Sequence, residues 1–135
     1  MALIHFRNRK KSLKQPSNSG IPREDEEQKR VILFLRVNYP LILFCASAGG
    51  MRTSMKQAMK MKATGYVSGF PDLFIYESRG GYHGLAIEMK RIKGGTVSNE
   101  QKEWQQKLRE RNYKSEICKG AVSAMKIIQE YLGQE

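Results

Sequence analysis

The chain has few of the features that mark membrane or secreted proteins. No apolar run approaches the roughly 20 residues that cross a bilayer, because Arg36, Asn38 and Pro40 interrupt the richest stretch, residues 31–46. The first residues, MALIHFRNRKK, lack a long apolar segment followed by a small-residue cleavage site. We therefore expect a protein that lies in the cytoplasm.

Cysteine and histidine are equally scarce. Cys45 and Cys118 are far apart, and neither belongs to a Cys-x-x-Cys motif or lies near His5 or His83. This spacing argues against a disulfide framework and against a structural zinc site. We expect two reduced thiols in or near β-strands.

Acidic residues are in short supply as well. The 135 residues include 24 Lys and Arg but only 13 Asp and Glu, so the formal net charge is +11. Residues 1–23 and 51–64 each carry several cations and no acid. Such clusters attract a polyanion, usually nucleic acid, although they also occur as solubilising surface. The isolated acids Asp72, Glu77 and Glu88 therefore stand out.

The content of apolar residues is sufficient for a folded domain, since 40% of the chain is hydrophobic. We expect a basic N-terminal arm over residues 1–23, either flexible or part of a dimer interface, and one domain over residues 24–135. Periodicity, caps and turns predict the order α β α β β α β α. This order indicates an α/β fold, with a mixed sheet of about four strands covered by helices. The expected elements are helices over 24–38, 53–63 and 121–132 and from Ser98 onward, and strands over 41–46, 72–77, 85–90 and 113–118.

The pattern also predicts how several elements are buried. The strand over 41–46 is continuously apolar, which is typical of burial on both faces. The helix over 53–63 should direct Met55 and Met59 toward the core and its lysines toward solvent. Trp104, at helical spacing from a leucine, is expected in the core rather than stacked on a base.

The predicted hairpin of residues 72–77 and 85–90 carries the candidate chemistry. The period of two places Glu88 and Lys90 on one face of their strand. If residue 77 pairs with residue 85, Asp72 lies opposite Lys90 and shares that face.

Two carboxylates and an ammonium would then occupy one small site on the hairpin. Carboxylate oxygens suit Mg²⁺ or Mn²⁺, and a neighbouring lysine can orient a water molecule. The alternative is a solvated strand face, with Asp72 serving only as a turn residue after Pro71. The combination on otherwise apolar strands favours a metal site suited to phosphodiester hydrolysis.

These residues give the chain a family resemblance. Gly69-Phe70-Pro71-Asp72 followed by Glu88-Met89-Lys90 resembles the bipartite signature of the PD-(D/E)xK nuclease superfamily. The wider set resembles the VRR-NUC domain over about residues 24–132. It comprises Gly49-Gly50-x-Arg52, Gly65, the two signature motifs, and Ser98-x-x-Gln101-x-x-Trp104. The resemblance implies a restriction-endonuclease-like α/β/α core.

The resemblance also implies roles for individual residues. Asp72 and Glu88 would be metal-binding carboxylates, the backbone carbonyl of Met89 a further ligand, and Lys90 the residue that positions the attacking water. Gln101 would help to hold that water or Lys90, although the same glutamine fits a capping box with Ser98.

The family has a further metal-binding and catalytic glutamate on its first helix, four residues before a glutamine or glutamate. Glu24 with Gln28 fits this spacing, and Glu27 is the competing choice. The alternative for all the acids at 24–27 is simple stabilisation of the helix N-terminus.

Basic residues that flank these acids are the candidate DNA contacts. They are Arg52, Lys56, Lys60, Arg91 and Lys93, of which Arg52 matches the family. No base-reading motif accompanies them, so we expect recognition of DNA shape rather than of sequence.

The function implied is that of a Mg²⁺- or Mn²⁺-dependent endonuclease that leaves a 5′-phosphate. Stand-alone members of the family resemble the dimeric resolvases of phages and bacteria, which favours a Holliday junction as substrate. Alternatives are a flap or other branched-DNA nuclease and a DNA-binding module without catalysis. A homodimer would place two cuts symmetrically. Its interface could be the apolar ALIHF segment near the N-terminus or the terminal helix, which could equally be core cover.

Overall fold

The computed structural model describes residues 20–48 and 52–135. The basic cluster before residue 20, the ALIHF segment and Gly49-Gly50 lie outside the described residues. The elements follow the expected order, and their bounds are α1 Glu24–Asn38, β1 Phe44–Ala46, α2 Met55–Ala63, β2 Leu73–Ile75, β3 Leu85–Lys90, α3 Asn99–Glu110, β4 Lys114–Lys119 and α4 Ala121–Leu132. Within these ranges, no helix combines the length and hydropathy that crossing a membrane requires.

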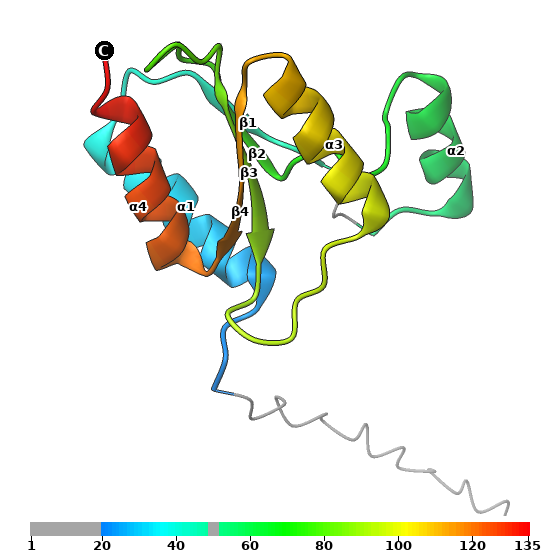
Figure 1. Ribbon diagram of the computed structural model, residues 1–135. Coiled ribbons are helices and arrows are strands. Elements are labelled where there is room, and N and C mark those ends of the chain that lie inside the picture. Colours follow the sequence, from blue (N-terminus) through cyan, green and yellow to red (C-terminus); the bar gives the residue numbers. More distant parts are fainter. Residues whose placement is uncertain (1–19, 49–51) are drawn as a thin grey trace, which may run out of the picture.

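A mixed four-stranded sheet forms the middle layer of the fold. Its strand order is β1-β2-β3-β4. The first two pairs are antiparallel, whereas β3 and β4 are parallel and are joined through α3. Helices α1 and α4 pack together on one face of the sheet, and α3 covers the other (Figure 1). The predicted α/β architecture is therefore confirmed.

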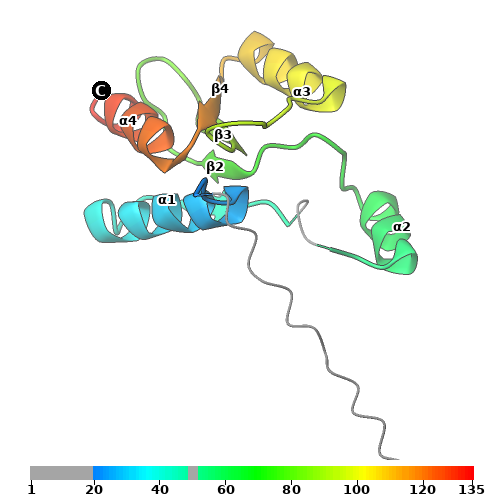
Figure 2. The ribbon, with the colours of Figure 1, turned by 90° about the horizontal axis from the view of Figure 1, so that it is seen from below.

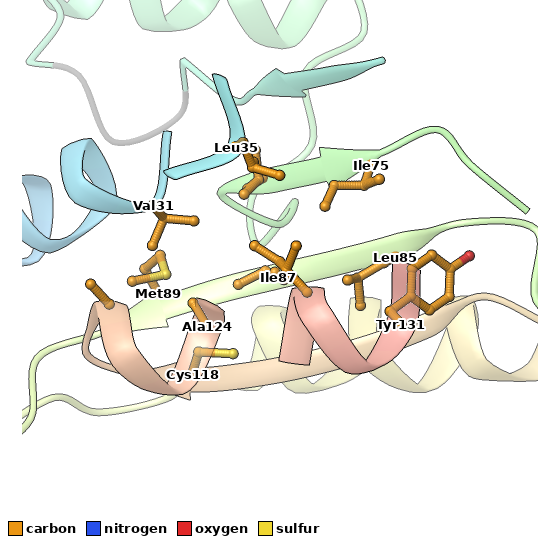
Figure 3. Packing of buried hydrophobic residues seen from close by; sticks show 12 residues of the cluster. Val31, Leu35, Ile75, Leu85, Ile87, Met89, Cys118, Ala124 and Tyr131 are labelled. Atoms are coloured by element: carbon orange, nitrogen blue, oxygen red, sulfur yellow. The ribbon is translucent and has the colours of Figure 1, made fainter. Parts of the chain in front are cut away.

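The central strand β3 is buried on both faces along its whole length. Leu85, Ile87 and Met89 enter the main core between the sheet and helices α1 and α4 (Figure 3). Ala86 belongs to a smaller cluster under α3 that also includes Phe74 and Leu108. Because side chains alternate along a strand, Glu88 and Lys90 also point to the α3 side. Two charged side chains are thus buried at the end of the strand.

The expected register of the hairpin is wrong by two residues. Ile75, not residue 77, pairs with Leu85, and Leu73 pairs with Ile87. The connection is longer than expected because Arg79 and Tyr82 close their own isolated bridge. A shift of two residues in the register keeps every side chain of the hairpin on its predicted face of the sheet. Continuing the pairing by one residue places Asp72 opposite Glu88 rather than opposite Lys90.

The expectation that residues 41–46 form a strand buried on both faces is also wrong. β1 covers only Phe44–Ala46, and Cys45 and Ala46 are exposed. β1 is an edge strand that pairs with β2 alone, and α3 lies over the opposite half of the sheet. Leu41 and Leu43, just before the strand, are 94% and 66% exposed. Apolar character alone did not identify an edge position.

Helix α2 does not have the buried face that its pattern predicts. None of its described residues is buried, and Met55 and Met59 are 83% and 66% exposed. The helix stands apart from the sheet and from the other helices (Figure 2). Its ends are defined locally, by a capping box between Ser54 and Gln57 and by the left-handed Gly65 after its C-terminus.

The tryptophan has the structural role expected of it, and the terminal helix has one of the two roles that its sequence left open. Ile128 and Tyr131 of α4 are fully buried, and Ile127 and Leu132 pack against the same core. Trp104 is partly buried against the cluster under α3. One face of α4 therefore covers the core. Both cysteines are free thiols, Cys45 exposed and Cys118 buried.

Gly69 brings the loop before β2 against the first turn of α3. Its φ of +89° lies in the left-handed region, and an added Cβ would lie 2.5 Å from the carbonyl carbon of Glu100 and 2.8 Å from the backbone nitrogen of Gln101. Only glycine allows this approach without displacement. The loop that carries Asp72 and the start of α3 are therefore fixed relative to each other.

Gly69→Ala should destabilise the fold much more than Gly65→Ala. Both glycines have positive φ, but a Cβ at Gly65 meets nothing within 4 Å. The matched pair therefore separates backbone strain, common to both, from overlap with α3. We expect Gly69→Ala to lower the free energy of unfolding by about 1–3 kcal/mol more than Gly65→Ala, measured by denaturant unfolding. Equal losses would show that the close approach is not rigid.

Candidate active site

The candidate residues meet at one end of the sheet, where β2 begins, β3 ends and helices α1 and α3 start (Figure 1). Asp72 is held there by the backbone, because its Oδ2 accepts a hydrogen bond of 2.7 Å from the amide of Met89. The bond joins the loop before β2 to the end of β3. It places the carboxylate of Asp72 beside Glu88, as the face pattern predicts.

Glu88 lies against Asp72, and the two side chains share a hydrogen bond. Burial raises the pKa of Glu88 to about 8, and the charge of Asp72 and a hydrogen bond between the two side chains add to this shift. Lys90 acts in the opposite direction. Two carboxyl groups in contact, one of them 8% exposed, bind either a proton or a cation between them. The structure therefore concentrates negative charge at a single point.

Lys90 supplies the positive charge nearest to this pair. Its ammonium nitrogen lies 3.5 Å from Oε1 of Glu88, and the residue is only 6% exposed. The two residues are neighbours on one face of β3, two positions apart. Lys90 is therefore close enough to orient a group bound between the carboxylates.

Gln101 serves the helix cap and the acidic pair at the same time. Its side-chain Oε1 accepts a hydrogen bond of 3.0 Å from the backbone amide of Ser98. In return, the backbone amide of Gln101 donates a hydrogen bond of 3.1 Å to Ser98 Oγ. Its side-chain Nε2 donates to Oε1 of Glu88 at 2.5 Å. The capping box therefore fixes the side chain that contacts Glu88. The two interpretations of Gln101 are compatible.

The two candidate acids of the first helix have different surroundings. Glu27 is 3% exposed, and its Oε2 accepts a 2.6 Å bond from the amide of Ala121, at the start of α4. It thus replaces the side-chain cap that Gly120 lacks. Glu24 faces the acidic pair instead. Burial raises the pKa of Glu24, and the charges of Lys90 and Asp72 act on it in opposite directions.

The acids alone do not form a complete metal cage. In residues 20–48 and 52–135, no group of three His, Cys, Asp or Glu side chains is suitably placed to hold an ion. The close pair is Asp72 with Glu88, and Glu24 lies at its edge. Any cation there would need backbone or water oxygens in addition.

The candidate DNA contacts lie at different distances from this pair. Arg52 and Lys60 line a hollow beside α2, and Lys56 is exposed on the same helix. Lys93 is exposed in the turn after β3. Arg91 is half-buried, and its Nη2 donates to the carbonyl of Ile21 at 3.3 Å. One guanidinium is thus partly engaged in holding the start of α1.

Two further cations lie near the site and were not among the candidates named from the sequence. Lys29 and Arg36 of α1 line a groove of about 750 Å³ that Asp72 and Glu24 also line. Their seven-residue spacing places them on one helix face, which was a signal available in the sequence. That this face adjoins Asp72 depends on the folded arrangement.

Comparisons with known proteins identify the family of the chain. The family model described as VRR-NUC domain matches residues 18–122. A solved structure titled "VRR_NUC domain protein" is similar to this chain, with 29% sequence identity and a TM-score of 0.69. The alignment covers 82% of this chain and 88% of that chain. No curated protein matches the chain.

The family match extends over most of the chain and includes Glu24, Asp72, Glu88, Lys90 and Gln101. A VRR-NUC domain implies a PD-(D/E)xK nuclease, and nucleases of this type generally use divalent metal ions. A nuclease domain in turn implies binding to DNA. The chain belongs to the VRR-NUC family of PD-(D/E)xK nucleases.

Proposed function

We propose that the chain is a Mg²⁺- or Mn²⁺-dependent endonuclease that cuts branched DNA, and that it resolves four-way junctions as a homodimer. The contact between Asp72 and Glu88, flanked by Lys90 and Gln101, is the observation that best supports the chemistry. This nuclease domain would comprise residues 24–135, preceded by a basic arm.

The donor set at the site suits a hard divalent cation. Asp72 and Glu88 offer only oxygen atoms, and a cation between them would offset two like charges that otherwise share a proton. The backbone carbonyl of Met89 would be a further ligand, and Glu24 of α1 would complete the set of residues that hold the ion. When bound, the ion would supply Lewis-acid stabilisation of the phosphate and would lower the pKa of a bound water.

The buried lysine would direct that water. Its ammonium group beside Glu88 is able to donate a hydrogen bond and so to aim the oxygen at phosphorus, in line with the bond that breaks. Gln101 would keep Glu88 in place through its amide. Cleavage of the bond from phosphorus to the 3′ oxygen would leave a 5′-phosphate and a 3′-hydroxyl group.

The proposal of a homodimer follows from the substrate. A four-way junction is resolved by two cuts in strands of like polarity, and one active site cannot make both at once. A two-fold dimer can. Val37, Leu41 and Leu43 support self-association, because these large apolar side chains are 68%, 94% and 66% exposed along one stretch of the chain.

Removal of divalent metal should abolish cleavage. With EDTA we expect at least a roughly 100-fold loss of activity on labelled DNA, because the acidic pair would then hold a proton instead of an ion. Mg²⁺ or Mn²⁺ should restore the activity, whereas Ca²⁺ should support binding without turnover. Full activity in a rigorously chelated sample would exclude the metal mechanism.

Substitutions at the acidic pair should separate cleavage from binding. Glu88→Gln and Lys90→Ala should each slow cleavage by at least about 100-fold, because Glu88 would hold the metal ion and Lys90 would position the attacking water. DNA affinity should remain near the wild-type value, or rise for Glu88→Gln as repulsion is removed. Gel shift and single-turnover cleavage measure the two quantities.

The matched control for this pair is Glu103→Gln. Glu103 forms an exposed ion pair of 2.7 Å with Lys107 on α3, outside the site, so cleavage should not change.

Replacing Lys56 and Lys60 by Ala should affect DNA binding, whereas Glu88→Gln should affect cleavage. Binding to all DNA shapes should weaken, with a smaller dependence on salt. Normal cleavage by Lys90→Ala would refute the role of this lysine.

A panel of four-way junction, flap and linear duplex, each with Mg²⁺, tests the substrate and the oligomeric state together. We expect paired cuts in the junction and, by light scattering, a mass near twice 15.5 kDa. Leu41→Asp should yield monomers that still nick DNA but lose paired cutting. Val122→Asp, at an 81% exposed position of α4, is the control and should remain dimeric. A wild-type monomer that cuts only flaps would identify a flap nuclease instead.

A further inference from the structure

The groove along α1 reaches Asp72, one member of the acidic pair. It is lined by one face of the helix over about three turns, together with Ser47, Asp72 and Arg91. Asp72 and Glu24 form one end of this groove. A molecule lying in it would therefore pass directly from the helix surface to the candidate catalytic carboxylates.

Charge changes sign along the groove. The acids lie at its catalytic end, where Asp25 is paired with Arg23 at 3.4 Å and Arg91 lies near Glu24. Lys29 and Arg36 lie farther along the helix. Among the described residues, neither of these two cations takes part in an ion pair or a side-chain hydrogen bond. The far part of the groove is therefore positive, with its charges available.

The spacing of the two cations fits a nucleic-acid backbone. Lys29 and Arg36 are two helical turns apart, about 10 Å along the helix axis. Measured along the duplex axis, one DNA strand rises about 3.4 Å per nucleotide, so cations this far apart can reach two different phosphates of the same strand. Between them, Ile32 is half-buried and Leu33 is 64% exposed, which gives the groove an apolar floor suited to deoxyribose. Phosphates along the rim and sugars on the floor would match both features.

We propose that this groove holds the backbone of one DNA strand beside the scissile phosphate, with Lys29 and Arg36 contacting its phosphates. The inference rests on the proposed endonuclease function and adds a second strand path, separate from the basic residues of α2. Charge complementarity and continuity with Asp72 identify the occupant. The contacts involve the backbone only, so the groove would position DNA without reading its sequence.

The test compares loss of positive charge inside the groove with loss of a positive charge on the same helix but outside the groove. Lys29→Ala and Arg36→Ala remove cations that line the groove, whereas Arg30→Ala removes an exposed cation that does not line it. Binding of a fluorescent four-way junction is measured by anisotropy in EDTA, at several salt concentrations. The double variant Lys29→Ala/Arg36→Ala should bind about 10-fold more weakly, with a salt slope smaller by about 2. Arg30→Ala should remain within about two-fold of the wild type.

The outcomes separate this inference from the proposed function. If Lys29→Ala and Arg36→Ala bind DNA as Arg30→Ala does, the groove is not a strand path, even if the wild type cleaves junctions. If the double variant loses affinity as expected while no DNA is cut with Mg²⁺, the groove is supported and the endonuclease proposal fails. All three positions are exposed, so we expect each variant to keep the fold, and thermal unfolding of each variant checks this.

Discussion

The arrangement of the site depends on the burial of two charged side chains at the end of the central strand. Burying an unpaired carboxylate or ammonium is costly, so each needs a partner in place. Glu88 has Lys90 at 3.5 Å, the amide of Gln101 and the carboxyl of Asp72. Asp72 in turn is fixed by the backbone of β3. The groups that make burial tolerable are the same groups that form the candidate catalytic centre.

Most of the fold was predictable because its central elements carry strong local signals. The bounds of α1 and α4 follow from their periodicity, and the start of α3 follows from the capping box of Ser98. The errors concern elements at the margin of the sheet. The exposure of β1 and α2 is set by which neighbours cover them, and local periodicity contains no information on this. The hairpin register failed for a related reason, since the bridge of Arg79 with Tyr82 lengthens the turn.

The site could be predicted to the extent that it follows the alternation of β3. Glu88 and Lys90 are forced onto one face, and an error of two residues in register still leaves Asp72 on that face. The choice between Glu24 and Glu27 could not be made in this way. It depends on where α4 begins, because Glu27 is occupied by the amide of Ala121. The sequence likewise did not place Lys29 and Arg36 near the site, because their position in the same groove as Asp72 depends on the packing of α1.

The distribution of charge explains how an acidic centre and a polyanionic ligand are compatible. Carboxylates that attract a cation also repel phosphate, so affinity for DNA has to come from elsewhere on the molecule. The cations that we propose for this role lie on exposed faces of α1 and α2, where they remain hydrated and cost little to the fold. Glu88, in contrast, is buried on the face of the sheet that α3 covers, where the low dielectric strengthens its interactions. Because these cations are exposed and Glu88 and Lys90 are buried, the cations can be replaced without disturbing the buried groups.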